Sequence, residues 1–256
     1  MMHERDYWDE VSLNMSGHHL ETGIALYKRQ QHIRLIEEWT EGKLSNSSVL
    51  KTDGFEEAFG GDFFSDFLLE KTKKTFLIDI SKVICEKTKT HFPALNVITA
   101  SVTAVPLKNS SIDIVISNST LDHLNTSDVE TALYELHRIL SKNGLLILTL
   151  DNANNVLYKL GYSIKKKYFK GYHQEKCYYV EDIKPLLEKN GFAVDEIQSI
   201  VHIPTPINFI LKWVSPIDKL LFRIPSTSLI SFFDFFGRNG RNICSGWFLA
   251  LKCVKK

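Results

Sequence analysis

The sequence predicts an α/β protein with a mostly parallel sheet that carries helices on both faces. Short apolar runs of β type alternate with longer helical patterns between residues 48 and 202, and this alternation favours parallel strands joined by helical crossovers. Polar or small residues follow the runs, where a parallel sheet carries its functional groups. The chain has 256 residues, of which 44% are hydrophobic, so one large core with an appended segment is expected.

The first 47 residues are predicted to form a helical cap. Residues 22–41 carry Ile24, Tyr27, Ile36 and Trp39 among many charges, which is the pattern of an amphipathic helix. Gly42 follows directly and is a typical helix stop. This helix is expected to lie beside the first strand or to cover it.

Residues 48–202 and 246–256 are predicted to form the core, with seven strands in total. The predicted strands are Val49–Leu50, Thr75–Ile80, Asn96–Thr99, Ile112–Ile116, Gly144–Leu150, Phe192–Ile200 and Gly246–Val254. Ser81 is expected to cap the helix after the second strand. Ser127 and Glu130 are expected to form a capping box for a helix that ends near residues 143–144.

Residues 203–245 are predicted to form an apolar helical insertion before the last strand. Its part 203–241 is rich in phenylalanine but is interrupted by prolines and charges, so it predicts no membrane-spanning helix. Three roles remain open for this part: a helical cap that completes the core, a lid over a hydrophobic acceptor site, or a peripheral membrane or dimer contact.

Charge and the first residues narrow the class of protein. The formal net charge of the whole chain is only +1, which excludes a strongly basic nucleic-acid binder. No nucleic-acid partner is expected. No apolar run follows a basic start, so a cytoplasmic protein is expected, with peripheral membrane attachment as an open alternative. The four cysteines lack the paired spacing of a metal site, and no metal is predicted.

Candidate site residues follow the first four strands, because ligands of open parallel sheets lie beyond the carboxyl ends of the strands. Asp79 ends the second strand, where an ionised carboxylate can accept two hydrogen bonds from ribose hydroxyls. A plain helix-capping role for Asp79 is the alternative. The candidate residues are Lys51, Thr52, Asp53, Gly54, Asp79, Ile80, Ser101, Val102, Ser117 and Asn118.

Several motifs together resemble the class I S-adenosylmethionine-dependent methyltransferases. They are Leu77-Ile78-Asp79-Ile80, then Val105-Pro106-Leu107 running into residues 112–118, Leu121-Asp122-His123-Leu124, and the helix-to-strand stretch 136–147. The resemblance covers roughly residues 49–200, with 246–254 as the closing strand. It implies a Rossmann-like methyltransferase sheet with a reversed final hairpin and bound S-adenosyl-L-methionine. By the same resemblance Asp79 would hold the ribose, and Ser101 with Val102 would border the adenine.

The turn after the first strand departs from the glycine-rich turn of that family. It reads Lys51-Thr52-Asp53-Gly54 and resembles a Leu-Lys-Thr-Asp variant found in a subset of the family. This resemblance implies that Lys51 meets the methionyl carboxylate and that Asp53 meets the ammonium group. The alternative is a solvated surface ion pair in a tight turn.

The resulting hypothesis is methyl transfer from S-adenosylmethionine to a small, apolar or lipid-linked acceptor. His123 and His173 are candidate general bases, because histidine titrates near neutrality; a structural role is the alternative for each. A methyltransferase-like protein without catalysis, acting as a binding or scaffold subunit, is the alternative function. A nicotinamide-dependent oxidoreductase is disfavoured, because no Gly-x-Gly-x-x-Gly follows the first strand.

Overall fold

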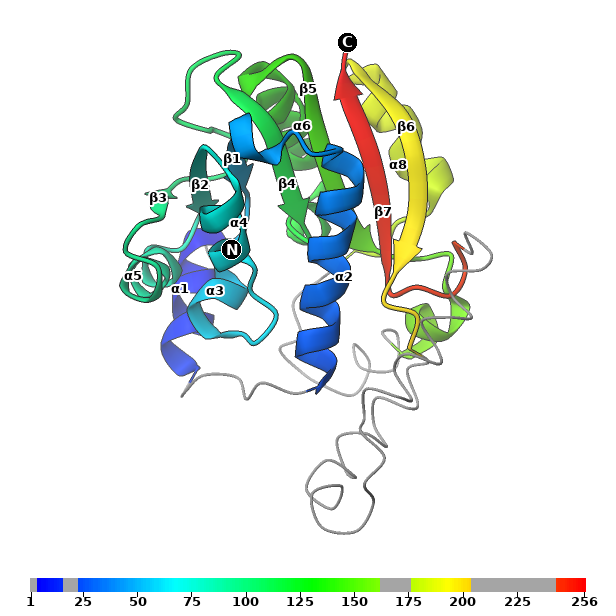
Figure 1. Ribbon diagram of the computed structural model, residues 1–256. Helices are drawn as coiled ribbons and strands as arrows, with labels where there is room; N and C mark the ends of the chain where they lie inside the picture. The colour runs from blue at the N-terminus through cyan, green and yellow to red at the C-terminus, as the bar shows by residue number, and fades with distance from the viewer. Residues whose placement is uncertain (1–3, 16–22, 162–175, 204–242) are drawn as a thin grey trace.

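The computed structural model describes residues 4–15, 23–161, 176–203 and 243–256. At its centre is one seven-stranded sheet in the order β3-β2-β1-β4-β5-β7-β6 (Figure 1). The strands are β1 (Ser48–Lys51), β2 (Lys74–Asp79), β3 (Asn96–Thr99), β4 (Ile112–Asn118), β5 (Leu140–Asp151), β6 (Phe192–Ile200) and β7 (Phe248–Lys255). Strands β1 to β5 pair in parallel, whereas β7 is antiparallel to both of its neighbours. The predicted α/β class is confirmed.

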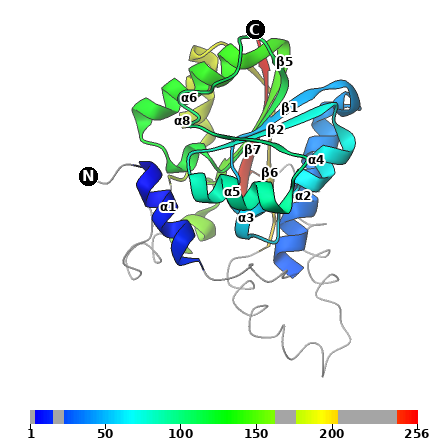
Figure 2. The ribbon, with the colours of Figure 1, turned by 90° about the vertical axis from the view of Figure 1, so that its left-hand side faces the viewer.

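Helices cover both faces of the sheet. Helices α6 and α8 lie on one face, and α2 and α4 lie on the other (Figure 2). The helices are α1 (Glu4–Asn14), α2 (Gly23–Thr40), α3 (Phe55–Phe59), α4 (Ser65–Lys71), α5 (Lys82–His91), α6 (Thr126–Ile139) and α8 (Val180–Lys189), with 3-10 turns η1 (Leu44–Asn46) and η2 (Leu121–His123). The helix predicted over residues 22–41 is confirmed as α2. The φ of +78° at Gly42 suits glycine just after this helix.

The two cores follow from the alternation of side chains along the strands. On β1, Val49 packs with α2 and α4, whereas its neighbour Leu50 packs with α6 and α8. On β4, Ile114 and Ile116 belong to the α2 side and Val115 to the α6 side. Because both faces are buried, the central strands are continuous apolar runs, and polar residues gather only at the strand ends.

The predicted capping box of α6 is wrong. Asn125 is the N-cap, and its side-chain oxygen accepts a hydrogen bond from the backbone N–H of Asp128 at 3.0 Å. The hydroxyl of Ser127 donates to that same oxygen. Asparagine is at least as good a cap as serine and lies two residues earlier, so it sets the start of the helix. By contrast, the predicted cap of α5 is confirmed, since Ser81 accepts from the N–H of Ile84 at 3.2 Å.

The predicted end of α6 near residues 143–144 is also wrong. The helix ends at Ile139, and Leu140 already pairs with Ile112 as the first residue of β5. Asn143 has a φ of +59°, and the pairing register with β4 shifts in this region. Asn143 and Gly144 therefore mark an irregularity in a long strand rather than a helix terminus.

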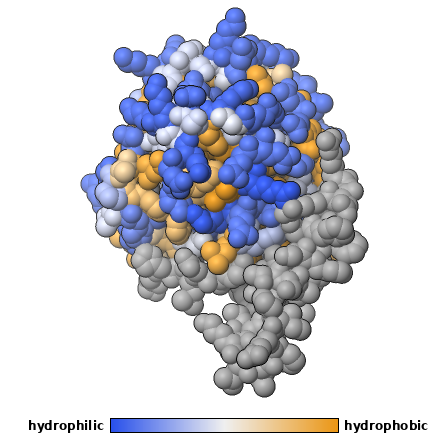
Figure 3. Space-filling view, in the orientation of Figure 1, coloured by the Kyte–Doolittle hydropathy of each residue, from blue (hydrophilic) through white to orange (hydrophobic). Residues whose placement is uncertain are grey.

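Most of the predicted apolar insertion, residues 204–242, lies outside the described residues. None of the helices within the described ranges is long and apolar enough to cross a membrane. The face that carries α2 is mainly hydrophilic, and apolar side chains show through in small patches (Figure 3).

Leu136→Ala is expected to lower the free energy of unfolding by about 2–5 kcal/mol, because it leaves a cavity beneath α6. Leu136 is fully buried in the core on this face. Tyr134→Ala on the same helix is the control, since Tyr134 is 63% exposed. Urea unfolding measures both. Equal losses in the two variants would contradict the assignment of Leu136 to the core.

Candidate functional site

A cavity of about 540 Å³ lies at the carboxyl ends of the central strands. This is where a parallel sheet binds ligands, near the point at which the strand order reverses between β1 and β4. Eight of the predicted site residues line it: Thr52, Asp53, Asp79, Ile80, Ser101, Val102, Asn118 and His123. Lys51, Gly54 and Ser117 do not line it. His173 lies outside the described residues.

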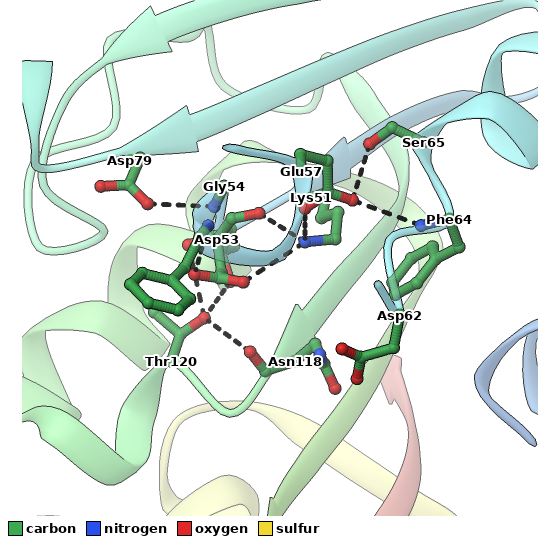
Figure 4. Close-up of polar contacts among 12 residues, drawn as sticks. Lys51, Asp53, Gly54, Glu57, Asp62, Phe64, Ser65, Asp79, Asn118 and Thr120 are labelled. Atoms are coloured by element: carbon green, nitrogen blue, oxygen red, sulfur yellow. Dashed lines mark hydrogen bonds and ion pairs between the residues drawn. The ribbon is translucent and has the colours of Figure 1, made fainter. Parts of the chain in front are cut away.

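Lys51 is buried beneath the cavity instead of facing it. It ends the central strand β1, is 1% exposed, and its Nζ donates to Glu57 Oε2 at 2.8 Å. The Phe64 ring lies 5.0 Å from Nζ (Figure 4). Lys51 therefore does not form a solvated surface ion pair with Asp53, which was the alternative considered for this turn. Burial alone would lower the pKa of Lys51, but the carboxylates of Glu57 and Asp53 raise it, so the charge is retained.

Glu57 is the residue that the sequence analysis missed. Its carboxylate is 2% exposed and accepts from Lys51 through one oxygen. The other oxygen accepts from the hydroxyl of Ser65 at 2.9 Å. The ion pair therefore joins β1 to α3 and to the start of α4. A buried pair is tolerated only when its remaining hydrogen-bonding positions are also satisfied, as they are here.

The loop after β1 is held by further contacts from the same lysine. Lys51 Nζ donates to the backbone carbonyl of Asp53 and lies 3.4 Å from its carboxylate Oδ2. The other carboxylate oxygen of Asp53 accepts from the N–H of Phe55, as in an Asx turn. These contacts place the Asp53 side chain at the cavity wall, with 22% of it exposed.

Gly54 is required for space rather than for an unusual backbone conformation. A Cβ atom at this position would lie 2.9 Å from Ile84 and 3.0 Å from Leu77, closer than packed atoms tolerate. Its N–H donates to Asp79 Oδ2 at 3.0 Å. The loop after β1 is thus pressed onto α5 and β2, which brings Asp53 and Asp79 to the same wall.

Asp79 ends β2 with its carboxylate at the cavity. One oxygen accepts from Gly54 and the other from the N–H of Ser81 at 2.8 Å. It does not cap α5, because Ser81 does. Burial, followed by the negative charge of Asp53, raises the pKa of Asp79 to about 7, although these two backbone N–H groups oppose the shift. Asp79 therefore titrates near neutrality.

A hydroxyl cluster connects β1 to the end of β4. The Thr52 hydroxyl donates to Ser117 at 3.2 Å and contacts the Thr120 hydroxyl at 2.7 Å. Ser117 is fully buried and acts on the strand rather than at the cavity. Asn118 lines the cavity, and its side-chain oxygen accepts from Thr149 on β5. Neighbouring strand ends are thereby fixed relative to one another.

Ser101 and Val102 follow β3 at the far end of the cavity. Val102 is buried in the core beneath α6 and still contributes to the cavity wall. The Ser101 hydroxyl contacts the Thr103 hydroxyl at 2.7 Å. This end of the cavity therefore combines an apolar wall with a neutral hydroxyl.

Helix α1 covers the cavity. The sequence predicted a helical cap over residues 1–47 but did not assign any part of it to the cavity. Four of its side chains line the cavity: Glu4, Tyr7, Trp8 and Val11. The Trp8 ring meets the ring of His123 edge-on, with centroids 5.0 Å apart. Asp9 accepts from the Ser81 hydroxyl and from the N–H of Val83 at 3.3 Å, so α1 is bound to the positive end of the α5 dipole.

The opposite end of the cavity holds residues that the sequence analysis did not single out. They are Lys28, His32, Glu56, Asp62, Asp151, Tyr158 and Phe248. Asp151 ends β5, so the rule that identified Asp79 could also have found it. Nothing in the sequence marks His32, because its exposure to the cavity depends on how α2 is rotated against the sheet.

Comparisons with known proteins agree with this geometry. Residues 56–148 match a family model described as a methyltransferase domain. A magnesium protoporphyrin IX methyltransferase from Synechocystis PCC 6803 with bound SAH is similar over 98% of both chains, with a TM-score of 0.62 and 14% identity. Comparison with curated proteins gives no significant match.

Two further solved structures have the same fold. An S-adenosylmethionine-dependent methyltransferase from Thermotoga maritima is 18% identical, with a TM-score of 0.58 over 91% of each chain. One from Mesorhizobium loti is 13% identical, with a TM-score of 0.56 over 85% of this chain and 96% of that chain. At such identities the likeness concerns the fold alone.

Lys51→Met is expected to lower the free energy of unfolding by about 3–5 kcal/mol, because Glu57 then keeps a buried charge without a counterion. The double variant Lys51→Met/Glu57→Gln should recover most of this loss, since no charge is left buried between the two positions. Urea unfolding of the single and double variants measures the coupling.

Lys82→Met is the control for the loss of the Lys51 charge. Lys82 pairs with Glu86, and both side chains are largely exposed, so little change is expected. If Lys51→Met were no more destabilising than Lys82→Met, the buried pair would not be the anchor of the loop.

Proposed function

Residues 56–148 match a methyltransferase domain and the chain has the fold of S-adenosylmethionine-dependent methyltransferases. On these grounds we propose that it transfers a methyl group from S-adenosyl-L-methionine to a small-molecule acceptor. The observation that carries the proposal is one cavity at which the ends of four neighbouring strands present the residues expected to hold this cofactor. Bound S-adenosylmethionine supplies a methyl group activated by a positive sulfur.

Each strand end has its own part in binding the cofactor. The Asp79 carboxylate accepts from the ribose hydroxyls, and Ser101 with Val102 borders the adenine. Asp53 pairs with the ammonium of the methionyl group. Lys51 acts indirectly in this proposal, because it is bound to Glu57 beneath the cavity; it holds the loop that carries Asp53.

The rate of transfer arises mainly from alignment. A sulfonium methyl is already reactive, so holding the acceptor in line with it lowers most of the barrier. His123 lines the cavity and is the candidate general base within the described residues. His173 keeps that role only as a prediction. The apolar or lipid-linked nature of the acceptor was inferred from residues 203–241 and also stays a prediction.

S-Adenosylhomocysteine is expected to bind with an affinity that rises about tenfold between pH 6 and pH 8. Only the ionised Asp79 carboxylate accepts from both ribose hydroxyls, so the ligand favours the deprotonated form of a group whose pKa is about 7. Calorimetry at several pH values measures this. Asp79→Asn should bind at least tenfold more weakly at pH 8, without this rise.

Asp113→Asn is the matched control. Asp113 accepts from the N–H of Ser48 at the amino ends of β1 and β4, whereas the cavity lies at the carboxyl ends of these strands. It should bind S-adenosylhomocysteine as the wild type does. No binding by the wild type at millimolar ligand would overturn the proposal. Normal binding without methyl transfer to any acceptor in a cell extract would favour the scaffold alternative.

A further inference from the structure

The cavity divides into two halves along the sheet. The ends of β3, β2, β1 and β4 form the half assigned above to the cofactor. The other half lies over β5 and β7, where Asp151 and Phe248 line it beneath α2. Because this second half is continuous with the first, it is the part of the cavity available to the methyl acceptor.

His32 lines this second half with a buried ring. It lies on α2, is 3% exposed and lines the cavity. Its ring stacks on Phe64 and meets Phe248, with centroids 5.9 Å and 5.7 Å away. Nδ1 lies 2.9 Å from the carbonyl oxygen of Lys28, so Nδ1 is the protonated nitrogen. Nε2 then carries a lone pair, and this atom has no hydrogen-bond partner among the described residues.

A buried acceptor atom without a partner is costly in free energy, and a ligand that donates a hydrogen would satisfy it. Burial lowers the pKa of His32 to about 4, so the ring stays neutral and keeps its lone pair at ordinary pH. The nearby Lys51 and Lys28 charges also disfavour protonation, whereas Asp62 favours it. Nε2 is therefore a hydrogen-bond acceptor and a weak base.

The charges around His32 disfavour an anionic ligand. Lys28 forms an ion pair with Asp62, and the two charges offset each other. Burial and the hydrogen bond with Asp62 raise the pKa of Glu56 to about 9, so Glu56 is neutral near pH 7. The Asp151 carboxyl also lines this half and accepts from the Tyr158 hydroxyl at 2.9 Å. A carboxylate or phosphate would meet the His32 lone pair with no hydrogen to donate.

We propose that the methyl acceptor is a small neutral amine whose N–H group is bound by His32 Nε2, with its apolar part against Phe248. This inference rests on the proposed function and assigns the substrate class of the same cavity. The amine lone pair forms the new N–C bond, while the electrons of the C–S bond stay on sulfur, which becomes a neutral thioether. Nitrogen takes up the positive charge, and the extra proton then passes to water.

We prefer an amine to an alcohol as the acceptor because the two differ in when they must lose a proton. An alcohol oxygen must lose its proton as the methyl group arrives, which requires an effective base. A neutral amine attacks through its lone pair and needs only to be oriented, which a hydrogen bond to a weak base achieves. His32 can orient an amine through a hydrogen bond, but it is too weak a base to take the proton of an alcohol.

The test uses the full chain loaded with S-adenosylhomocysteine and three probes of similar size: benzylamine, benzyl alcohol and benzoate. Calorimetry at a pH where much of the benzylamine is neutral should show the amine and the alcohol, which can both donate a hydrogen to Nε2, binding more tightly than the anion. When S-adenosylmethionine replaces S-adenosylhomocysteine, only the amine should be methylated, because only the alcohol needs an effective base. His32→Phe keeps the ring contacts with Phe64 and Phe248 and should weaken benzylamine binding about tenfold. Its affinity for S-adenosylhomocysteine should stay within about twofold of the wild type. His137→Phe is the control, since His137 lies on α6 against Phe192.

A second readout does not depend on any variant. The ¹⁵N shifts of the His32 ring should report the Nδ1–H tautomer, and benzylamine should shift Nε2. Benzoate binding as tightly as benzylamine, no benzylamine binding at millimolar concentration, or an unchanged affinity in His32→Phe would overturn the amine proposal while S-adenosylhomocysteine binding stands. If the wild type did not bind S-adenosylhomocysteine at all, the proposed function itself would be overturned.

Discussion

The buried ion pair between Lys51 and Glu57 is the interaction on which the cavity depends. It places a retained charge at the end of the central strand β1, beneath the loop that carries Asp53 to the cavity wall. From one nitrogen, contacts run to α3 through Glu57 and to the loop through Asp53. Because a buried charge without its partner is strongly unfavourable, these elements are held together as a unit.

This arrangement explains how a chain without a glycine-rich turn can form such a site. A glycine-rich turn lets the backbone approach a ligand by removing side chains. Here the turn has a single glycine, Gly54, which is packed closely against Ile84 and Leu77. The loop is positioned instead by two contacts. The buried Lys51 ammonium contacts Asp53, and the Asp79 carboxylate on the neighbouring strand accepts from the N–H of Gly54. The cavity wall is thus set before any ligand binds, which lowers the ordering cost of binding.

The sequence predicted the strands and the residues at their ends, because parallel strands bring their carboxyl ends to one edge. It could not predict the partner of Lys51, because Glu57 lies six positions further along the chain. The path of the loop and helix between them decides the contact. The start of α6 was mispredicted because Asn125 and Ser127 are both good caps, and local propensity does not choose between them. His32 and the cover by α1 depend on how whole helices dock, which no local pattern encodes.

The most direct test of this account is a crystal structure of the chain with bound S-adenosylhomocysteine. The account predicts that Lys51 Nζ stays bonded to Glu57 and to the loop carbonyl of Asp53, with the methionyl group lying above them against Asp53. It also predicts that the ribose hydroxyls reach Asp79. A structure in which Lys51 leaves Glu57 and contacts the methionyl carboxylate directly would contradict the account.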